Sequence, residues 1–312
     1  MLVEKREEYK NGGIEKHQYM EEMFNIHKYL FEYPSLINDS PISKIEITKN
    51  QVIFTINNDS ESILLCCDRR DAYSIPMTFI DLSEFETEEN NMILNLIKPG
   101  DVVFDIGANI GWYTISILLK HKGTTVFSFE PIESSFQYLK KNLILNNLNT
   151  DNIFNFGLSD QNSTVTFYFD IECATASSMA NLREDEKTTI VECEVRKLDN
   201  FISSMPSLRR LDFIKCDVEG SELFVFKGAL DTIKKFKPII FSEMLRKWSK
   251  KFNYHPNDII NFFAEIGYEC FVVNQNKLKK IECVTEDTIE TNYLFLDKNK
   301  HIKLLSKMSL TS

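Results

Sequence analysis

The spacing of hydrophobic and polar positions differs between the first part of the chain and the remainder. Residues 14–33 combine Met, Phe, Leu and Tyr with Glu, Lys and His, which predicts a helix with one apolar stripe. Three short runs of β-type residues follow, at 44–48, 51–56 and 62–68. Turn-forming residues such as Asn, Asp and Ser separate these runs, so we expect an antiparallel meander.

A second helix is expected over 87–97, closed by Pro99 and Gly100. Beyond residue 100, apolar runs that are typical of buried strands alternate with segments of helical spacing. The expected strands are 102–106, 124–130, 152–158, 211–217 and 238–244. The expected helices are 112–120, 134–148, 222–236 and 256–267. This alternation predicts an α/β fold with a mostly parallel sheet and helices on both faces.

Four further runs complete the pattern. Those at 164–170 and 190–198 are strand-like and flank a polar loop at 174–181. Those at 268–274 and 291–297 predict an antiparallel hairpin added to the edge of the sheet.

The length and charge of the chain limit its organisation and its partners. A chain of 312 residues suggests two units, or one large domain with an extension. We divide it into an N-terminal extension, residues 1–80, and a main domain, residues 81–312. The formal net charge of -10 disfavours a nucleic-acid partner, because phosphate contacts require clustered Lys and Arg.

The cysteines and the termini carry a second set of expectations. The seven cysteines form no C-x-x-C pair and the histidines are scattered, so no zinc site is expected. Thiols in a reducing cytoplasm are the simpler interpretation. The first residues are too polar for a signal peptide, and no apolar run approaches the ~20 residues that span a bilayer. We therefore expect a cytoplasmic protein without a membrane span.

The segment DIGANIGWYTI, from Asp105 to Ile115, looks like a nucleotide-binding turn that departs from G-x-G-x-x-G. Asn109 stands between the two glycines of the turn, Gly107 and Gly111. A pyrophosphate requires glycine at its closest approach and no anion nearby. S-adenosylmethionine has no phosphate, and its ammonium favours a neighbouring carboxylate such as Asp105. The turn therefore favours S-adenosylmethionine over NAD, with the loop amides and the helix start expected to bind the carboxylate of this cofactor.

Acids end four of the predicted parallel strands: Asp105, Glu130, Asp217 and Glu243. Ligands of α/β sheets bind at the carboxyl ends of strands, near the point where strand order reverses. We therefore expect the four carboxylates to line one crevice. Glu130 is placed to accept hydrogen bonds from both ribose hydroxyls of the cofactor.

The stretch from Asp105 to about Glu243 resembles the FkbM-type methyltransferases. Six motifs carry the resemblance in order: DIGANIGWYTI, FEPIESSFQYLKKNL, GLSD, KLDNFI, FIKCDVEGSELFVFKGA and PIIFSEM. The sequence D-V-E-G-S-E is the most specific, because its spacing to the glycine motif and its place after an apolar strand both match. Residues 1–80 resemble no family that we can name.

The resemblance implies a class I methyltransferase fold, Rossmann-like with a seven-stranded sheet, and methyl transfer from S-adenosylmethionine to oxygen. Known members act on hydroxyls of sugars, glycans and polyketide-type metabolites. The residues expected at the cofactor are Asp105, Gly107, Ala108, Asn109, Gly111, Glu130, Pro131, Ser159 and Asp160, the last as a partner of the adenine amino group. One departure is that Met244 and Leu245 follow Glu243, where the family often has a histidine. No histidine base can be assigned there.

A hydroxyl acceptor must lose its proton during methyl transfer, and a general base accelerates such a step by ~10²–10⁴-fold. Asp217 is the first candidate for this role and Glu243 the second. Either could instead hold the cofactor ammonium, orient the acceptor or bind magnesium. A divalent metal is thus compatible with the sequence, but no residue is assigned as its ligand.

Three residues near these carboxylates have competing interpretations. Glu222 begins a helix, where acids stabilise free amides, and we interpret it as structural. For Glu219, both this structural role and a functional role are kept as interpretations. Ser177 lies in the polar loop that the resemblance puts near the acceptor.

Other functions are weighed against this hypothesis. A nicotinamide dehydrogenase would carry G-x-G-x-x-G. Nucleic-acid methyltransferases that modify base amino groups commonly carry N/D-P-P-Y/F, where this chain has CDVEG; a protein acceptor is a further alternative. A non-catalytic cofactor-binding partner is disfavoured by the intact Asp105, Glu130 and Asp217. Residues 1–80 are expected to cover the acceptor or to form a homodimer, not to bind cofactor.

Overall fold

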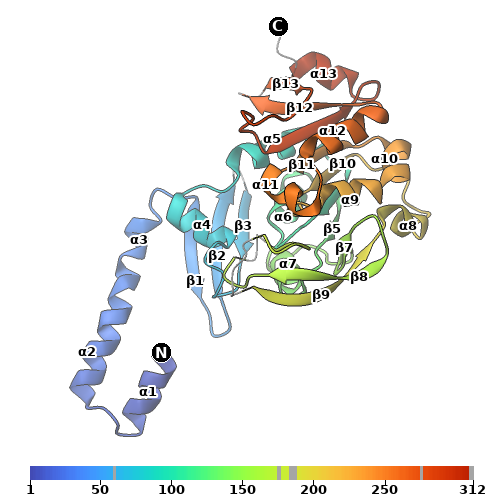
Figure 1. The fold of residues 1–312 in the computed structure, drawn as a ribbon. Helices are drawn as coiled ribbons and strands as arrows, with labels where there is room; N and C mark the ends of the chain where they lie inside the picture. Colours follow the sequence, from blue (N-terminus) through green and yellow to red (C-terminus); the bar gives the residue numbers. More distant parts are fainter. Residues whose placement is uncertain (59–60, 174–176, 183–187, 275–276, 309–312) are drawn as a thin grey trace.

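The computed structural model describes residues 1–58, 61–173, 177–182, 188–274 and 277–308. The chain begins with an arm of two antiparallel helices, α1 (Leu2–Lys10) and α2 (Lys16–His27), which projects from the body (Figure 1). The 3-10 turn η1 (Lys28–Phe31) and α3 (Tyr33–Leu36) follow. The single helix expected over 14–33 therefore ends earlier, at His27, where the 3-10 turn begins.

The predicted meander is present as β1 (Ile42–Ile47), β2 (Val52–Asn58) and β3 (Glu61–Leu65), paired antiparallel. Two helices, α4 (Ile75–Leu82) and α5 (Thr87–Leu96), connect it to the main sheet. Ile56 and Ile63 of the meander are fully buried in the same cluster as Leu139 of the main domain. The proposed boundary near residue 80 does not interrupt this core.

The main sheet has the strand order β13-β12-β14-β11-β10-β4-β5-β6. Its strands are β4 (Val102–Ile106), β5 (Thr125–Phe129), β6 (Ile153–Phe154), β10 (Phe213–Cys216), β11 (Ile239–Glu243), β12 (Tyr268–Asn274), β13 (Lys277–Ile281) and β14 (Asn292–Asp297). The strands from β6 to β11 are parallel, and the last three join antiparallel. The chain leaves β4 toward β5 and later returns to β10 on the other side, so the strand order reverses between β4 and β10.

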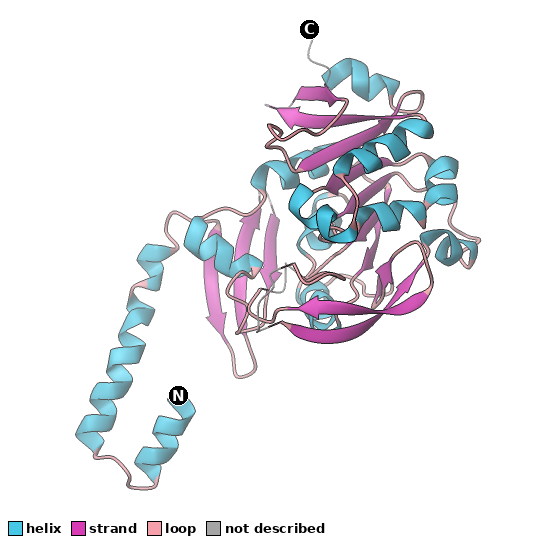
Figure 2. Ribbon diagram, viewed as in Figure 1, coloured by secondary structure: helices cyan, strands magenta, loops and turns pink. Residues whose placement is uncertain are grey.

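Helices cover both faces of this sheet (Figure 2). They are α6 (Trp112–Lys120), α7 (Glu133–Leu145), α8 (Leu198–Ser203), α9 (Glu222–Lys227), α10 (Leu230–Phe236), α11 (Arg246–Ser249) with the 3-10 turn η3 (Lys250–Phe252), α12 (Pro256–Glu265) and α13 (Ile302–Met308). Adjacent strand residues supply different cores, because Val103 packs with α6 and α7 while Phe104 packs with α9 and α12. Strands buried on both faces explain the continuous apolar runs in the sequence.

Three features differ from the sequence expectation. The sheet has an eighth strand, because β13 pairs with β12 at the edge. The run 152–158 forms β6 and then β7 (Gly157–Leu158), which joins β8 (Ser163–Phe169) and β9 (Thr189–Arg196) in a separate sheet. The helix expected over 222–236 is interrupted at Gly228, where a Cβ would lie 1.9 Å from the carbonyl oxygen of Ser159.

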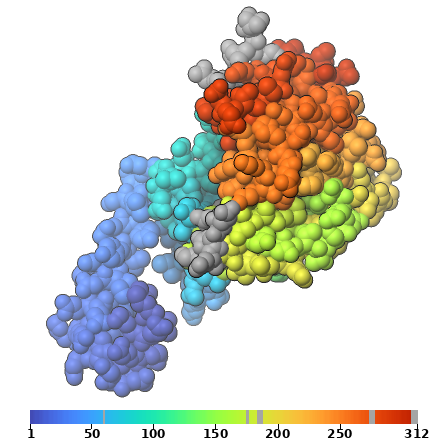
Figure 3. Space-filling view, viewed as in Figure 1, coloured from blue at the N-terminus to red at the C-terminus, as the bar shows by residue number. Residues whose placement is uncertain are grey.

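The arm stands clear of the body in the space-filling view (Figure 3). Among its side chains only that of Met23 is buried, whereas Phe24 is 61% and Phe31 is 78% exposed. Among the described residues, no helix combines the length and the apolar character that a membrane crossing requires.

Candidate active site

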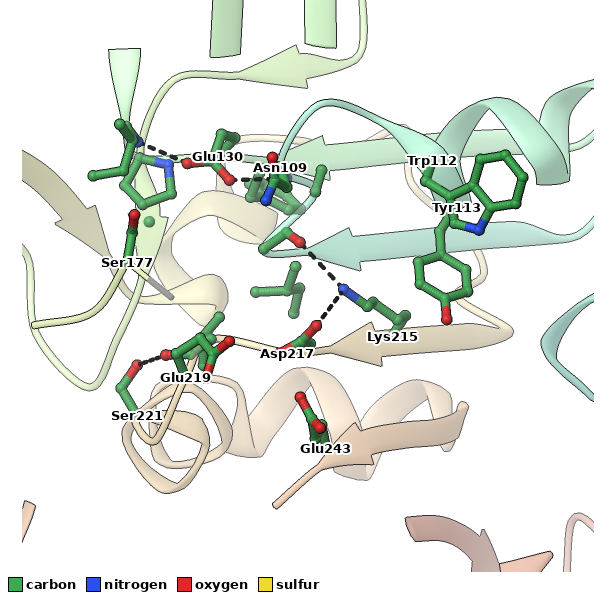
Figure 4. A pocket seen from close by; sticks show the side chains of 18 of the residues that line it. Asn109, Trp112, Tyr113, Glu130, Ser177, Lys215, Asp217, Glu219, Ser221 and Glu243 are labelled. Carbon is green, nitrogen blue, oxygen red and sulfur yellow. Dashed lines mark hydrogen bonds and ion pairs between the residues drawn. The ribbon is translucent and has the colours of Figure 1, made fainter. Parts of the chain in front are cut away.

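A cavity of about 500 Å³ opens at the carboxyl ends of β4, β5, β10 and β11, where the strand order reverses (Figure 4). This volume lies in the range of small-molecule sites. Seven residues expected from the sequence line it: Gly107, Ala108, Asn109, Glu130, Pro131, Asp217 and Glu243. Tyr73, Ile75 and Thr78 also contribute to the wall, so residues of the N-terminal extension reach the site.

The loop after β4 is held in one conformation by its own backbone. Gly107 has φ +79°, and a Cβ there would lie 1.9 Å from the carbonyl oxygen of Asp217. The amides of Gly107 and Ala108 both donate to the carbonyl of Phe129, at 3.0 and 3.1 Å. The glycine is therefore required by the close approach of β10 as well as by its backbone angle.

Glu130 is the best-defined polar group on the cofactor side of the cavity. Its side chain is 6% exposed, and its two oxygens accept the amides of Asn109 and Ile132, each at 2.9 Å. Burial raises the pKa of Glu130 to about 7, although the two amide hydrogen bonds oppose the shift. Each carboxylate oxygen keeps a further lone pair for a ligand donor. Two adjacent hydroxyls, as on a ribose, match this arrangement.

The group of residues around Glu130 fits S-adenosylmethionine. Apolar side chains of Ile132, Leu158 and Phe129 line the same part of the cavity, where an adenine ring could pack. The carboxylates of the opposite part suit a ligand that carries positive charge. A pyrophosphate would instead lie against acids, as the sequence analysis argued.

Asp105 lies behind the cavity and is fully buried. Its Oδ2 accepts the hydroxyl of Thr114 at 2.6 Å, and its Oδ1 lies 3.9 Å from Nζ of Lys215. Burial, the largest influence, raises the pKa of this carboxyl above its ordinary value. The structure therefore does not bring Asp105 to the cavity wall, and the ammonium contact expected from the sequence is not available to it. The positive charge beside Asp105 is the ammonium of Lys215.

Lys215 is the functional candidate that the sequence analysis missed. Its side chain is 3% exposed, yet it lines the cavity, and Figure 4 shows it between the glycine loop and Asp217. Nζ donates to the carbonyl of Gly107 and to Oδ2 of Asp217, both at 3.2 Å. A sequence signal existed, because Lys215 is charged inside an apolar strand and shares a face with Asp217 two positions later.

Three carboxyl groups converge at the acceptor side of the cavity. Oxygens of Asp217, Glu219 and Glu243 lie within 4.8 Å of one another, a spacing that a divalent cation could bridge. Burial, with the charges of Asp217 and Glu219, raises the pKa of Glu243 to about 10. Burial and the charge of Asp217 also raise the pKa of Glu219. The raised pKa favours the protonated form of Glu243, which makes it a weaker base and is consistent with its rank behind Asp217.

A further acid, Glu86, reaches the cavity from the segment before α5. It accepts the hydroxyl of Tyr113 at 2.6 Å, and burial raises the pKa of its carboxyl. Tyr113 and Trp112 are buried in the cavity wall. Glu86 lies before the first sequence motif, so no sequence signal marked it as a site residue.

Besides Asp105, three predicted cofactor residues fall outside the cavity wall as defined by the described residues. Gly111 precedes α6 with φ +97°, where a Cβ would lie 2.6 Å from Leu139. Ser159 and Asp160 follow β7, and their backbone lies against Gly228. The placement of Ser159 and Asp160 follows from β7 leaving the main sheet to pair with β9. The contact of Asp160 with an adenine stays a prediction.

Of the remaining candidate residues, one has a structural role and another lines the cavity. Glu222 is buried, accepts the amide of Gly220 at 2.9 Å and the hydroxyl of Tyr254 at 3.0 Å, and is structural as interpreted. Burial raises its pKa to about 7. Ser177 lines the cavity, as the resemblance implied, whereas residues 174–176 of that loop lie outside the described residues. Ser178 donates to the carbonyl of Glu219 at 2.7 Å and so supports the acidic turn.

Comparison with known proteins finds relatives that are named as methyltransferases. A relative from Beauveria bassiana, Methyltransferase 1, is 27% identical over 145 residues, covering 41% of this chain and 58% of that protein. The 31-O-demethyl-FK506 methyltransferase FkbM of Streptomyces tacrolimicus is 48% identical over 48 residues, covering 15% and 18%. The 2-O-methyltransferase NoeI of Sinorhizobium fredii is 26% identical over 168 residues, covering 49% and 68%. The chain thus spans less than two thirds of the first two relatives.

Among solved structures, the FkbM methyltransferase of Methylobacillus flagellatus is similar with a TM-score of 0.42 and 19% identity, over 73% of this chain and 55% of that one. The model of the methyltransferase FkbM domain matches residues 105–270, which is more than half of the chain. This span contains the glycine loop, Glu130, Lys215 and the three convergent carboxyl groups. The chain belongs to the FkbM methyltransferase family.

Proposed function

We propose that this protein is an S-adenosylmethionine-dependent O-methyltransferase that acts on a hydroxyl of a sugar, glycan or secondary metabolite. The observation that carries the proposal is the position of Asp217. Its carboxylate ends β10 in the same cavity that contains the glycine loop and Glu130. The names of two relatives, a 2-O-methyltransferase and a 31-O-demethyl-FK506 methyltransferase, support oxygen as the acceptor atom.

Methyl transfer requires the acceptor oxygen to be aligned and to lose its proton. S-adenosylmethionine, when bound, supplies a methyl group on a positively charged sulfur. Asp217 would accept the hydroxyl proton as the acceptor oxygen takes the methyl group and the carbon–sulfur bond breaks. Lys215 holds the Asp217 carboxylate through the contact at 3.2 Å. Glu243, protonated at neutral pH, donates a hydrogen bond to the acceptor instead of removing its proton.

The test is incubation with S-adenosylmethionine carrying an isotope-labelled methyl group, together with hydroxylated sugars, glycans and polyketide-type compounds. Mass spectrometry then locates the label. Parallel reactions with and without a chelator decide whether the carboxyl groups of Asp217, Glu219 and Glu243 use a divalent metal. Label on a nucleic acid or a protein, or cofactor binding without any transfer, would favour the alternatives. A cytoplasmic location and a homodimer stay predictions.

A further inference from the structure

Four amides of the loop that is expected to bind the carboxylate of the cofactor donate to acceptors within the protein. The amides of Gly107 and Ala108 donate to Phe129, and that of Asn109 donates to Glu130. The amide of Gly111 donates to the carbonyl of Ala108 at 2.9 Å. An anion that approached these four amides would therefore have to break a hydrogen bond for each contact that it gained.

The start of α6 already has a carboxylate beside it. Helix N-termini bind anions through free amides and the helix dipole. Here the first turn lies against the protein's own carboxylate, because Asp105 accepts the hydroxyl of Thr114 at 2.6 Å. An anion at this helix start would therefore lie near Asp105, and binding of the cofactor carboxylate there stays a prediction.

Lys215 is the cation that remains beside this loop. Its ammonium has three hydrogens, and two are accounted for by Gly107 and Asp217. Among the described residues, the next acceptor, Oδ1 of Asp105, lies 3.9 Å away, which is too far for a hydrogen bond. Nζ also lies 5.1 Å from the centroid of the Tyr113 ring. One donor of an almost fully buried ammonium in the cavity wall is thus left for a ligand.

The charge of Lys215 is permanent under ordinary conditions. Burial alone would lower the pKa of this lysine, but the carboxylates of Asp217, Asp105 and Glu86 outweigh it and raise the pKa above the usual value. A fixed cation surrounded by acids matches an anionic group with a positive group beside it. The amino-acid moiety of S-adenosylmethionine has this pattern of charges.

We propose that Lys215 binds the carboxylate of the cofactor's amino-acid moiety and selects ligands that carry this group, an inference that rests on the proposed cofactor. Lys215 is a positioning residue in this account, since its contact with Gly107 and Asp217 joins the cofactor loop to the reaction zone. The reacting methyl group is thereby held at a fixed distance from Asp217.

The test is isothermal calorimetry of the full chain with S-adenosylhomocysteine and with its decarboxylated analogue. The wild type should prefer the ligand with the carboxylate by roughly 10- to 100-fold, as expected for a hydrogen bond between charged groups. Lys215→Met should reduce this preference to near unity by weakening S-adenosylhomocysteine binding. Lys247→Met is the matched control, because Lys247 also lines the cavity but its ammonium lies over the Trp248 ring; it should keep the preference.

Lys215→Met leaves buried carboxylates without a partner, and such a change often destabilises a fold. The double variant Asp105→Asn/Lys215→Met removes the buried lysine together with the fully buried carboxylate beside it and should show the same loss of preference. Retention of the preference in a folded Lys215 variant, or an equal loss in Lys247→Met, would overturn the assignment. A wild type that binds neither ligand would refute the proposed cofactor as well, whereas binding both equally would refute only the role of Lys215.

Discussion

Replacement of Glu130 by glutamine tests how the cavity recognises its cofactor. The carboxylate accepts two backbone amides at 2.9 Å and is 6% exposed, so its remaining lone pairs are the acceptors for ligand hydroxyls. A hydrogen bond to a charged group is worth about 1.5–3 kcal/mol. Glu130→Gln should therefore weaken S-adenosylhomocysteine binding by roughly 10- to 100-fold in calorimetry.

The pKa of Glu130 adds a second, independent readout. Burial raises this pKa to about 7, so the carboxyl is mostly protonated below that pH and mostly ionised above it. The ionised fraction is about one tenth at pH 6 and about nine tenths at pH 8, so the apparent Kd should be about ninefold lower at pH 8. Binding should also release protons at pH 7, which calorimetry in buffers of different ionisation enthalpy measures.

The same shift affects the free protein in the opposite direction. Because the folded pKa of Glu130 exceeds the unfolded value, the folded state binds more protons between the ordinary pKa of glutamate and about pH 7. The contribution of this group to the free energy of unfolding therefore falls as pH rises through that window. A ligand that binds the carboxylate should offset the loss.

Glu222 provides the control for this pH dependence. Burial raises its pKa to about 7 as well, but its carboxyl binds Gly220 and Tyr254 outside the cavity wall. Glu222→Gln should keep the pH dependence of cofactor binding, and Glu130→Gln should remove it. Unchanged affinity and unchanged pH dependence in Glu130→Gln would show that the ribose hydroxyls bind elsewhere.

Three further outcomes follow from the geometry. At saturating cofactor, Asp217→Asn should lose most turnover, by roughly 10²-fold or more. Glu243→Gln should lose much less turnover, because glutamine resembles the protonated acid. A larger loss in Glu243→Gln than in Asp217→Asn would exchange the roles of the two residues. Gly107→Ala should abolish cofactor binding and lower the melting temperature, since its Cβ would overlap Asp217, and wild-type calorimetry and melting would contradict this. Deletion of residues 1–36 should preserve the melting transition, but deletion to Leu82 should not, because it removes fully buried side chains such as Ile63; thermal unfolding of both proteins decides.

Much of the fold could be predicted because burial on both faces leaves a simple pattern. Parallel strands such as β4 and β10 appear as unbroken apolar runs, and their acids must meet at one edge of the sheet. This logic correctly brought Glu130, Asp217 and Glu243 into one cavity. The hydrophobic pattern could not predict α1, because its residues are mostly polar and none of them is buried.

The errors concern features that depend on which neighbour a residue meets in three dimensions. Asp105 was assigned to the cofactor because nothing in the sequence shows that Thr114 and Lys215 enclose it. Asp160 falls outside the cavity wall because β7 departs from the main sheet, which leaves no local signal in the sequence. Lys215 was overlooked because a charge inside an apolar strand was treated as part of the strand.

The most direct test of the central claim is label transfer by the wild type and by Asp217→Asn, side by side. Both proteins receive S-adenosylmethionine with a labelled methyl group and the same panel of hydroxylated sugars, glycans and polyketide-type compounds, and mass spectrometry reads the products. The account predicts one labelled oxygen on an acceptor with the wild type, and nearly none with Asp217→Asn despite retained S-adenosylhomocysteine binding. Equal transfer by the two proteins, or label on nitrogen of a nucleic acid or protein, would contradict it.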